Sequence, residues 1–157
     1  MGAWGYKALE NDTGSDVLFL LREYISNKPD LKLDDFISVM KLNGFFDDAY
    51  GKTDYVCDQA ALAIVELYIV YHDISRFKDD SEADCDLKKM FCNVKSFSAD
   101  RESLFFLLRY LVSIRDEESN DDGEREILSI WKRSRYWDEW KKHLLFLVER
   151  IETELVD

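Results

Sequence analysis

The chain has 157 residues, 46% of them apolar, and it carries a formal net charge of −12 at pH 7. Its length is typical of a single domain, and its apolar content is too high for a disordered acidic tail. So acidic a protein is a poor partner for nucleic acid, because contacts to phosphate require lysine and arginine side chains.

Two helices are predicted in the N-terminal third of the chain. Asp12 or Thr13 can cap the first helix, whose apolar residues recur at intervals of three and four. Residues 27–29 end this helix, since the residue before a proline avoids the helical conformation. The second helix starts near Asp34 and stops at residues 43–44, where Asn-Gly is a common C-terminal signal.

The third predicted helix differs from the others because it is apolar on almost every side. Thr53 can cap it, and it runs to about Tyr71. Glu66 is its only charged residue between positions 60 and 71. A helix without a polar face is expected at the centre of a bundle.

The second half of the chain also shows helical periodicity. A short apolar segment covers residues 87–91, and Ser98 opens a longer amphipathic helix. Residues 127–131 predict a short helix, and apolar side chains repeat every seven residues through residues 137–155. The tryptophans of this last helix fall within the repeat, which favours a place in the core over a surface that stacks bases or binds a partner.

No segment shows the alternating pattern of a confident strand. The sequence therefore predicts an all-α fold, a single-domain bundle of about six or seven helices that spans residues 1–157. No apolar run is long enough to cross a bilayer, and no secretory signal is evident at the N-terminus. Three cysteines, an odd number, fit free thiols in a reducing compartment, so we expect a cytoplasmic protein.

Two acidic segments, expected to be loops between helices, hold almost all of the net charge. Residues 79–86 contain five acids and no base, and residues 116–126 contain seven acids and one arginine. Segments with charge of one sign attract and steer a cationic partner. We predict that they bind the partner through Asp79, Asp80, Glu82, Asp84, Asp86, Asp116, Glu117, Glu118, Asp121 and Asp122.

Glu66 is the residue of greatest chemical interest outside these segments, because it is a lone charge in an apolar helix. An enzyme could use it in a carboxylate pair with Asp58 or Asp73, and a buried, unpaired Glu66 beside a cavity would favour that alternative. A structural ion pair with an arginine such as Arg109 is the simpler interpretation. No motif for a catalytic nucleophile, a metal ion or a cofactor is found, and none of these is expected.

The opening residues resemble the start of a family of small bacterial proteins of unknown function, which begin M-G-x-W-G and continue with E-N-D or D-N-D before a helix. Leu9 and Gly14 depart from the family pattern. The resemblance implies an all-helical domain, and some proteins of this kind resemble immunity proteins of polymorphic or contact-dependent toxin systems. The matching residues are Met1, Gly2, Trp4, Gly5, Glu10, Asn11, Asp12 and Asp16.

These matching residues are expected to form scaffold and not a catalytic motif. Gly2 and Gly5 would let the backbone turn closely around Trp4, which would close one end of the bundle. Capping and favourable charge near the helix dipole would fix the start of the first helix, through Asn11, Asp12 and Asp16.

The hypothesis that follows is an immunity protein that binds and neutralises a basic toxin domain, a nuclease being the simplest case, through an acidic surface. One alternative is an enzyme that uses the carboxylate of Glu66. Another is an acidic regulatory adaptor or nucleic-acid mimic that binds a protein which handles DNA. No nucleic acid, membrane or small-molecule substrate is expected as a partner.

Overall fold

Helices form most of the computed structural model, which describes residues 5–26, 28–46, 55–73, 82–119 and 123–156, without the side chains of residues 82–86. Seven helices and one small sheet lie in these ranges, and the predicted all-α class is confirmed. The helices are α1 (Asp12–Ile25), α2 (Leu33–Leu42), α3 (Tyr55–Asp73), α4 (Glu82–Phe91), α5 (Arg101–Arg115), α6 (Glu126–Lys132) and α7 (Trp137–Val156). None of them is both long and apolar enough to span a bilayer, within the ranges given.

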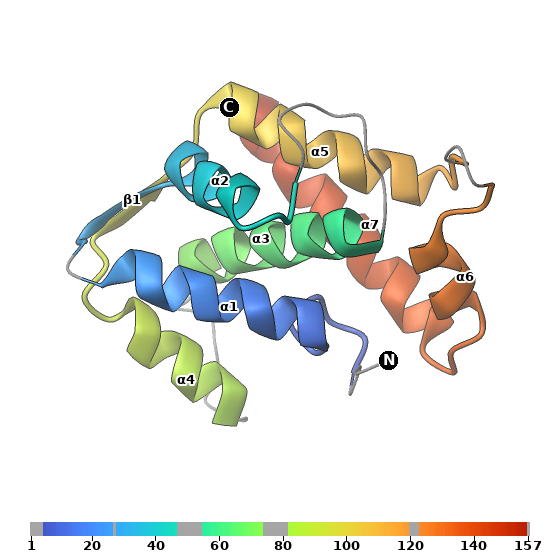
Figure 1. The fold of residues 1–157 in the computed structure, drawn as a ribbon, viewed down its shortest axis with the longest axis horizontal. Coiled ribbons are helices and arrows are strands. Elements are labelled where there is room, and N and C mark those ends of the chain that lie inside the picture. Colours follow the sequence, from blue (N-terminus) through green and yellow to red (C-terminus); the bar gives the residue numbers. More distant parts are fainter. Residues whose placement is uncertain (1–4, 27, 47–54, 74–81, 120–122, 157) are drawn as a thin grey trace.

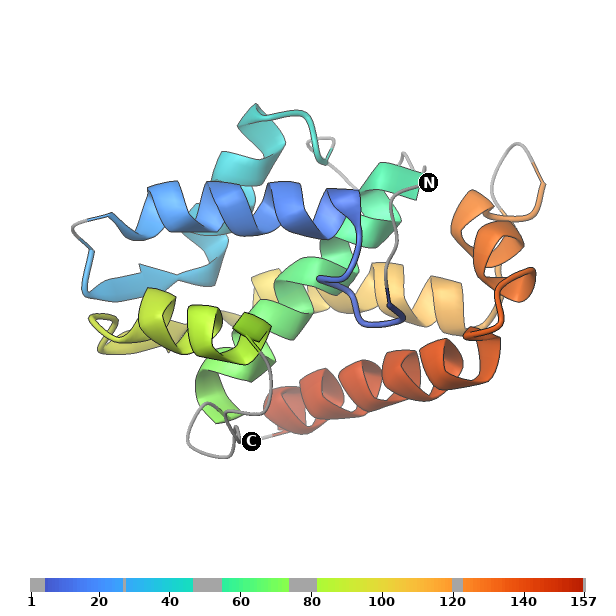
Figure 2. The ribbon, with the colours of Figure 1, turned by 90° about the horizontal axis from the view of Figure 1, so that it is seen from below.

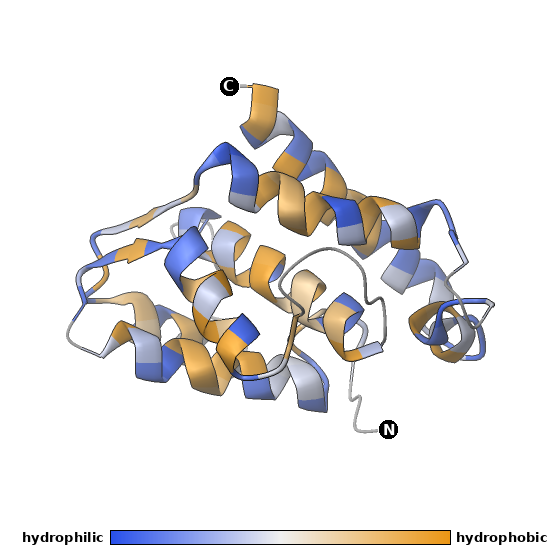
Figure 3. Cartoon of the chain, turned by 45° about the horizontal axis from the view of Figure 1, so that its top comes forward, coloured by the Kyte–Doolittle hydropathy of each residue, from blue (hydrophilic) through white to orange (hydrophobic). Residues whose placement is uncertain are grey.

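The central helix is α3, as its apolar sequence predicts. Every residue from Cys57 to Val70 is buried, and α3 packs against α1, α5, α6 and α7. Figures 1 and 2 show it crossing the middle of the bundle. In contrast, α1 carries alternating apolar and hydrophilic bands in Figure 3, because only one of its faces meets the core.

A two-stranded parallel sheet lies at one end of the molecule and was not predicted. Its strands are β1 (Asp30–Lys32) and β2 (Ser96–Ser98), and Leu31 pairs with Phe97. Each strand buries only its central residue, so three residues are too short to show alternation in the sequence. The prediction that Ser98 opens a helix is therefore wrong: α5 begins at Arg101, after the N-cap residue Asp100.

The N-terminal residues 5–11 are held against α3 by buried polar groups. Asn11 caps α1, because its side chain accepts a hydrogen bond from the Gly14 amide at 2.8 Å. The capping role expected of Asn11 among the matching N-terminal residues is confirmed, whereas Asp12 and Thr13, the caps suggested by the helical pattern, are not the N-cap. The carbonyl oxygen of Ala8 accepts hydrogen bonds from the side-chain amides of Asn11 at 3.0 Å and Gln59 at 3.2 Å. Trp4, the expected plug of the bundle, lies outside the described residues.

Gly14 is required by this arrangement, because the backbone of residues 8–9 passes close to its Cα atom. A Cβ atom at Gly14 would lie 2.4 Å from the Ala8 carbonyl oxygen and 2.8 Å from the Leu9 Cα atom. Both are backbone atoms of a segment that Asn11 and Gln59 hold in place, so they cannot move aside cheaply.

We therefore expect Gly14→Ala to lower the free energy of unfolding by about 1–3 kcal/mol, despite the better helix propensity of alanine. Urea denaturation checks this. Gly5→Ala is the matched control, since its Cβ would meet only the flexible carboxylate of Glu10. Equal stability of the Gly14→Ala variant and the natural chain would contradict the prediction.

Candidate functional site

The described parts of the two acidic segments lie at opposite ends of the molecule. Figures 1 and 2 place α4, which includes Glu82, Asp84 and Asp86, far from α6 along the long axis. The prediction that residues 79–86 form a loop is therefore wrong from Glu82 onwards. The structure separates the candidate residues into two groups, and a single acidic face does not include both. Four of the predicted residues lie outside the described ranges: Asp79, Asp80, Asp121 and Asp122.

The second acidic segment begins at the C-terminal end of α5, which closes with an unusual residue. The amide of Glu117 donates to the Ile114 carbonyl at 3.1 Å, and the amide of Glu118 donates to the Ser113 carbonyl at 3.0 Å. This pair of bonds is a Schellman motif, which places Glu117 in the left-handed conformation that glycine normally occupies. Glu117 has a φ of 54°, so its backbone is strained.

Arg125 fastens the other end of the α5–α6 loop (residues 116–125) to the central helix. Its guanidinium donates two hydrogen bonds to the carboxylate of Asp58, at 3.0 and 3.1 Å, and a third to the Glu118 carbonyl at 3.0 Å. Both side chains of the ion pair are at most 3% exposed. Because Asp58 neutralises the only base in the acidic segment, Arg125 does not offset the surface charge of the acids around it.

The exposed charges of the loop are partly matched by neighbouring bases. Lys132 of α6 lies 2.6 Å from a carboxylate oxygen of Glu117 and 2.6 Å from one of Glu124. The hydrogen bond from Lys132 lowers the pKa of Glu117, and the same bond raises the pKa of Lys132. Asp116 pairs with Arg115 at 3.0 Å. One lysine shared between two carboxylates leaves a negative charge at the surface.

A narrow groove of about 160 Å³ lies between α5, α6 and α7, next to this loop. We call it the aromatic groove. Most of its lining is apolar, and charged side chains stand at its margin. The lining residues are Ile114, Leu128, Trp137, Trp140, Leu144 and Leu145, with Arg115, Glu117 and Lys141 as the charged ones.

Stacked tryptophans form the floor and wall of the aromatic groove. Trp140 stacks on Trp131 with ring centroids 5.6 Å apart, and on Trp137 at 5.7 Å. Trp131 and Trp140 are buried, whereas Trp137 is half-buried and has the ammonium of Lys141 over its ring. The predicted core role is thus confirmed for Trp140, and Trp137 presents part of its ring to solvent. Sequence spacing could not separate these two cases, because both residues fall within the same heptad pattern.

Glu66 has partners, and they are not the ones predicted. One carboxylate oxygen contacts the imidazole Nε2 of His143 of α7 within hydrogen-bond distance, and the other accepts a hydrogen bond from the Leu9 amide at 3.1 Å. The predicted pairing with Arg109 is wrong. Glu66 is therefore buried but paired, and it does not match the buried, unpaired carboxylate that would favour an enzyme. Asp58, one of the two acids considered as its partner, binds Arg125.

Asp73, the other acid considered for a carboxylate pair, binds Arg150 of α7. Glu66 and Asp73 are seven residues apart on α3, and so are His143 and Arg150 on α7. The Glu66–His143 contact and the Asp73–Arg150 ion pair therefore join α3 and α7 side by side, with both helices running in the same direction. This arrangement gives Glu66 and Asp73 a structural role.

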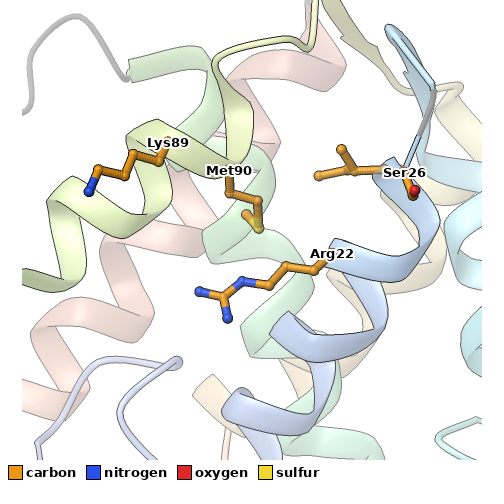
Figure 4. Close-up of a pocket in the computed structure, with 5 residues that line it drawn as sticks. Arg22, Ser26, Lys89 and Met90 are labelled. Carbon is orange, nitrogen blue, oxygen red and sulfur yellow. The ribbon is translucent and has the colours of Figure 1, made fainter.

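A second hollow, of about 450 Å³, lies between the C-terminal halves of α1 and α4. It is shallow and open to solvent. Figure 4 shows Arg22 and Met90 facing this space, whereas Lys89 extends away from it. The two cations do not converge on one point, so the hollow lacks the geometry of an anion site.

The left-handed backbone conformation of Glu117 should lower the stability of the fold, and a glycine at this position tests this directly. Glu117→Gly is expected to raise the melting temperature by about 2–4 °C, because glycine adopts the left-handed conformation without strain. The loss of one exposed ion pair offsets little of this gain. Calorimetry of the variant measures the effect. The control is Glu117→Ala, which removes the same carboxylate but retains the strain, and it should not be stabilised.

The fold and the paired charges define a single-domain, all-α protein with an aromatic groove beside an acidic loop. A family model described as a domain of unknown function, DUF4259, matches residues 2–143. The chain belongs to this family. No curated protein and no solved structure gives a significant match.

Proposed function

We propose that this protein is an inhibitor of the immunity-protein type, which binds a basic toxin domain through the α5–α6 loop. The observation that carries the proposal is the joint position of exposed carboxylates and an apolar groove at one end of the bundle. Such a combination of apolar centre and charged margin is typical of protein–protein interfaces. The opening residues resemble a family of unknown function, and the resemblance of some proteins of that kind to immunity proteins supports the same interpretation.

The charge of the protein supports a basic partner. A toxin that cuts nucleic acid needs lysine and arginine side chains to hold phosphate, and a carboxylate surface complements those groups. Opposite charge on two partners also speeds their association at low ionic strength. The net charge of −12 makes the whole molecule contribute to this attraction.

Of the two acidic segments, we assign the binding role to the α5–α6 loop. Asp116, Glu117 and Glu118 lie in the described part of this loop, and Glu117 lines the groove. The hollow of Figure 4 lies beside the C-terminal half of α4, and the cationic side chains of Arg22 and Lys89 are among the residues that line it. A basic partner therefore has less to gain at that end.

The test starts with purification of the chain from its native cells and identification by mass spectrometry of the protein that accompanies it. A basic domain whose toxic activity is blocked by the chain supports the proposal. Association is then followed by stopped-flow fluorescence for a variant with Asp116→Asn, Glu117→Gln and Glu118→Gln. We expect slower association and a weaker dependence on salt.

The matched control makes the same change of charge at the other end of the molecule, with Glu82→Gln, Asp84→Asn and Asp86→Asn. It should retain most of the association rate. A neutral or acidic partner would refute the proposal. If the control slows association and the loop variant does not, the assignment to the α5–α6 loop is wrong. A partner that handles DNA without being toxic would instead support the adaptor or nucleic-acid mimic.

A further inference from the structure

We infer that the aromatic groove receives one large apolar side chain from a basic segment of the partner protein, while neighbouring lysine or arginine residues of that segment meet the acids of the loop. The inference rests on the proposed function and adds what the partner must present. Three properties of the groove support it: the size, the exposed apolar surface and the charge.

The size of the groove suits one side chain. Pockets that bind cofactors and drug-sized ligands generally have volumes of about 300–1,000 Å³. The aromatic groove, at about 160 Å³, is smaller than this range. Its apolar lining includes Trp137, Trp140, Ile114 and Leu144. Trp140, Ile114 and Leu144 are at most 4% exposed, so the half-buried ring of Trp137 offers most of the dispersion contact that these four side chains can give to an occupant.

Exposed apolar surface continues from the groove to the outside of α7. Leu145 lines the groove and is 48% exposed, and Trp137 is half-buried. Covering these two side chains would release their apolar surface from water, which favours association. Large anchors of this kind in a desolvated centre supply most of the binding energy of protein interfaces.

The charges around the groove select a basic occupant. Glu117 lines the groove, and Asp116 and Glu118 are its neighbours in the chain. Arg115 binds Asp116 at 3.0 Å, Glu117 shares Lys132 with Glu124, and Lys141 lies over the ring of Trp137. With Glu124 included, the described acids at this margin outnumber the bases by one. A second copy of this acidic chain would be repelled from the same surface, since both copies carry a charge of −12.

The experiment uses two synthetic peptides that differ in a single residue. The first has the sequence Lys-Lys-Gly-Leu-Gly-Lys-Lys, with both ends blocked, and the second has serine in place of leucine. NMR titration of the full chain follows the backbone amides of the loop and the methyl groups of Ile114, Leu128, Leu144 and Leu145. We expect the leucine peptide to bind about tenfold more tightly than the serine peptide and to shift these methyl resonances.

Two variants locate the effect. Leu145→Gln should abolish the preference for the leucine peptide, because it makes the rim of the groove polar. Leu42→Gln, at a side chain that is 88% exposed on α2, is the control and should retain the preference. Both positions are exposed enough for the variants to fold, which the amide spectrum checks directly.

Each remaining outcome is decisive. Equal binding of the two peptides, with shifts confined to the loop amides, would overturn the inference about the groove and leave the acidic interface standing. Failure of both peptides to bind at low salt would overturn the inference together with the acidic interface. A methyl shift elsewhere, or formation of a dimer in place of peptide binding, would also refute an anchor in the groove.

Discussion

Replacing Asp58 by asparagine is expected to lower the free energy of unfolding by about 3–5 kcal/mol, because it leaves the buried guanidinium of Arg125 without its counter-charge. The effect is large since both side chains are at most 3% exposed and water cannot take the place of the carboxylate. The same change should loosen the α5–α6 loop, which Arg125 holds through its hydrogen bond to Glu118. Guanidinium denaturation measures the loss of stability.

A double variant separates the charge from the contact. Asp58→Leu combined with Arg125→Met is expected to be much more stable than Asp58→Asn, because removal of both buried charges avoids the desolvation penalty. The control is Arg115→Met, which breaks an exposed ion pair with Asp116 and should cost less than about 1 kcal/mol. If Asp58→Asn unfolded at the same denaturant concentration as the natural chain, the ion pair would not be stabilising the fold.

Trp140→Ala is expected to cost a similar amount, about 3–5 kcal/mol, through loss of apolar contacts and formation of a cavity. Trp140 is 3% exposed and lies between the rings of Trp131 and Trp137. Its removal takes away the contact that joins α6 to α7. Thermal and chemical denaturation both report the loss.

The comparison with Trp137→Ala distinguishes core from surface within the same helix. Trp137 is half-buried, so its replacement should cost clearly less stability than that of Trp140. Trp137→Ala also removes a wall of the aromatic groove, so we expect it to weaken binding of the leucine peptide while the protein stays folded. Equal losses of stability in the two variants would show that Trp137 contributes as much to the core as Trp140 does.

The helical class and the central helix could be predicted from the sequence because their signals are local. The apolar residues of α3 surround the helix on every side, and those of α7 repeat every seven residues. Both patterns depend only on the geometry of one helix. The predicted secondary structure was wrong where the local sequence signal was short or ambiguous, as in β1, β2 and the start of α4. The sequence named Asn11, Asp12 and Thr13 as possible caps of α1 and could not choose among them, since all three are suitable cap residues; the structure selects Asn11.

The partners of buried charges could not be predicted in this way. Asp58 and Arg125 are 67 residues apart in the chain, and Glu66 and His143 are 77 apart. Which of several bases meets a buried acid depends on how distant helices pack, and the sequence contains no periodic signal for that choice. One hint was present: Arg125 is the only base in the segment 116–126, and such an isolated base suggests a specific partner.

Composition and helical periodicity are properties of short segments, so they are enough to predict an acidic, single-domain helical bundle. Helix packing, and no local pattern, places the described parts of the two acidic segments at opposite ends and one of them beside the aromatic groove. That groove forms where α5, α6 and α7 meet, so its shape and its charged margin exist only after the helices pack.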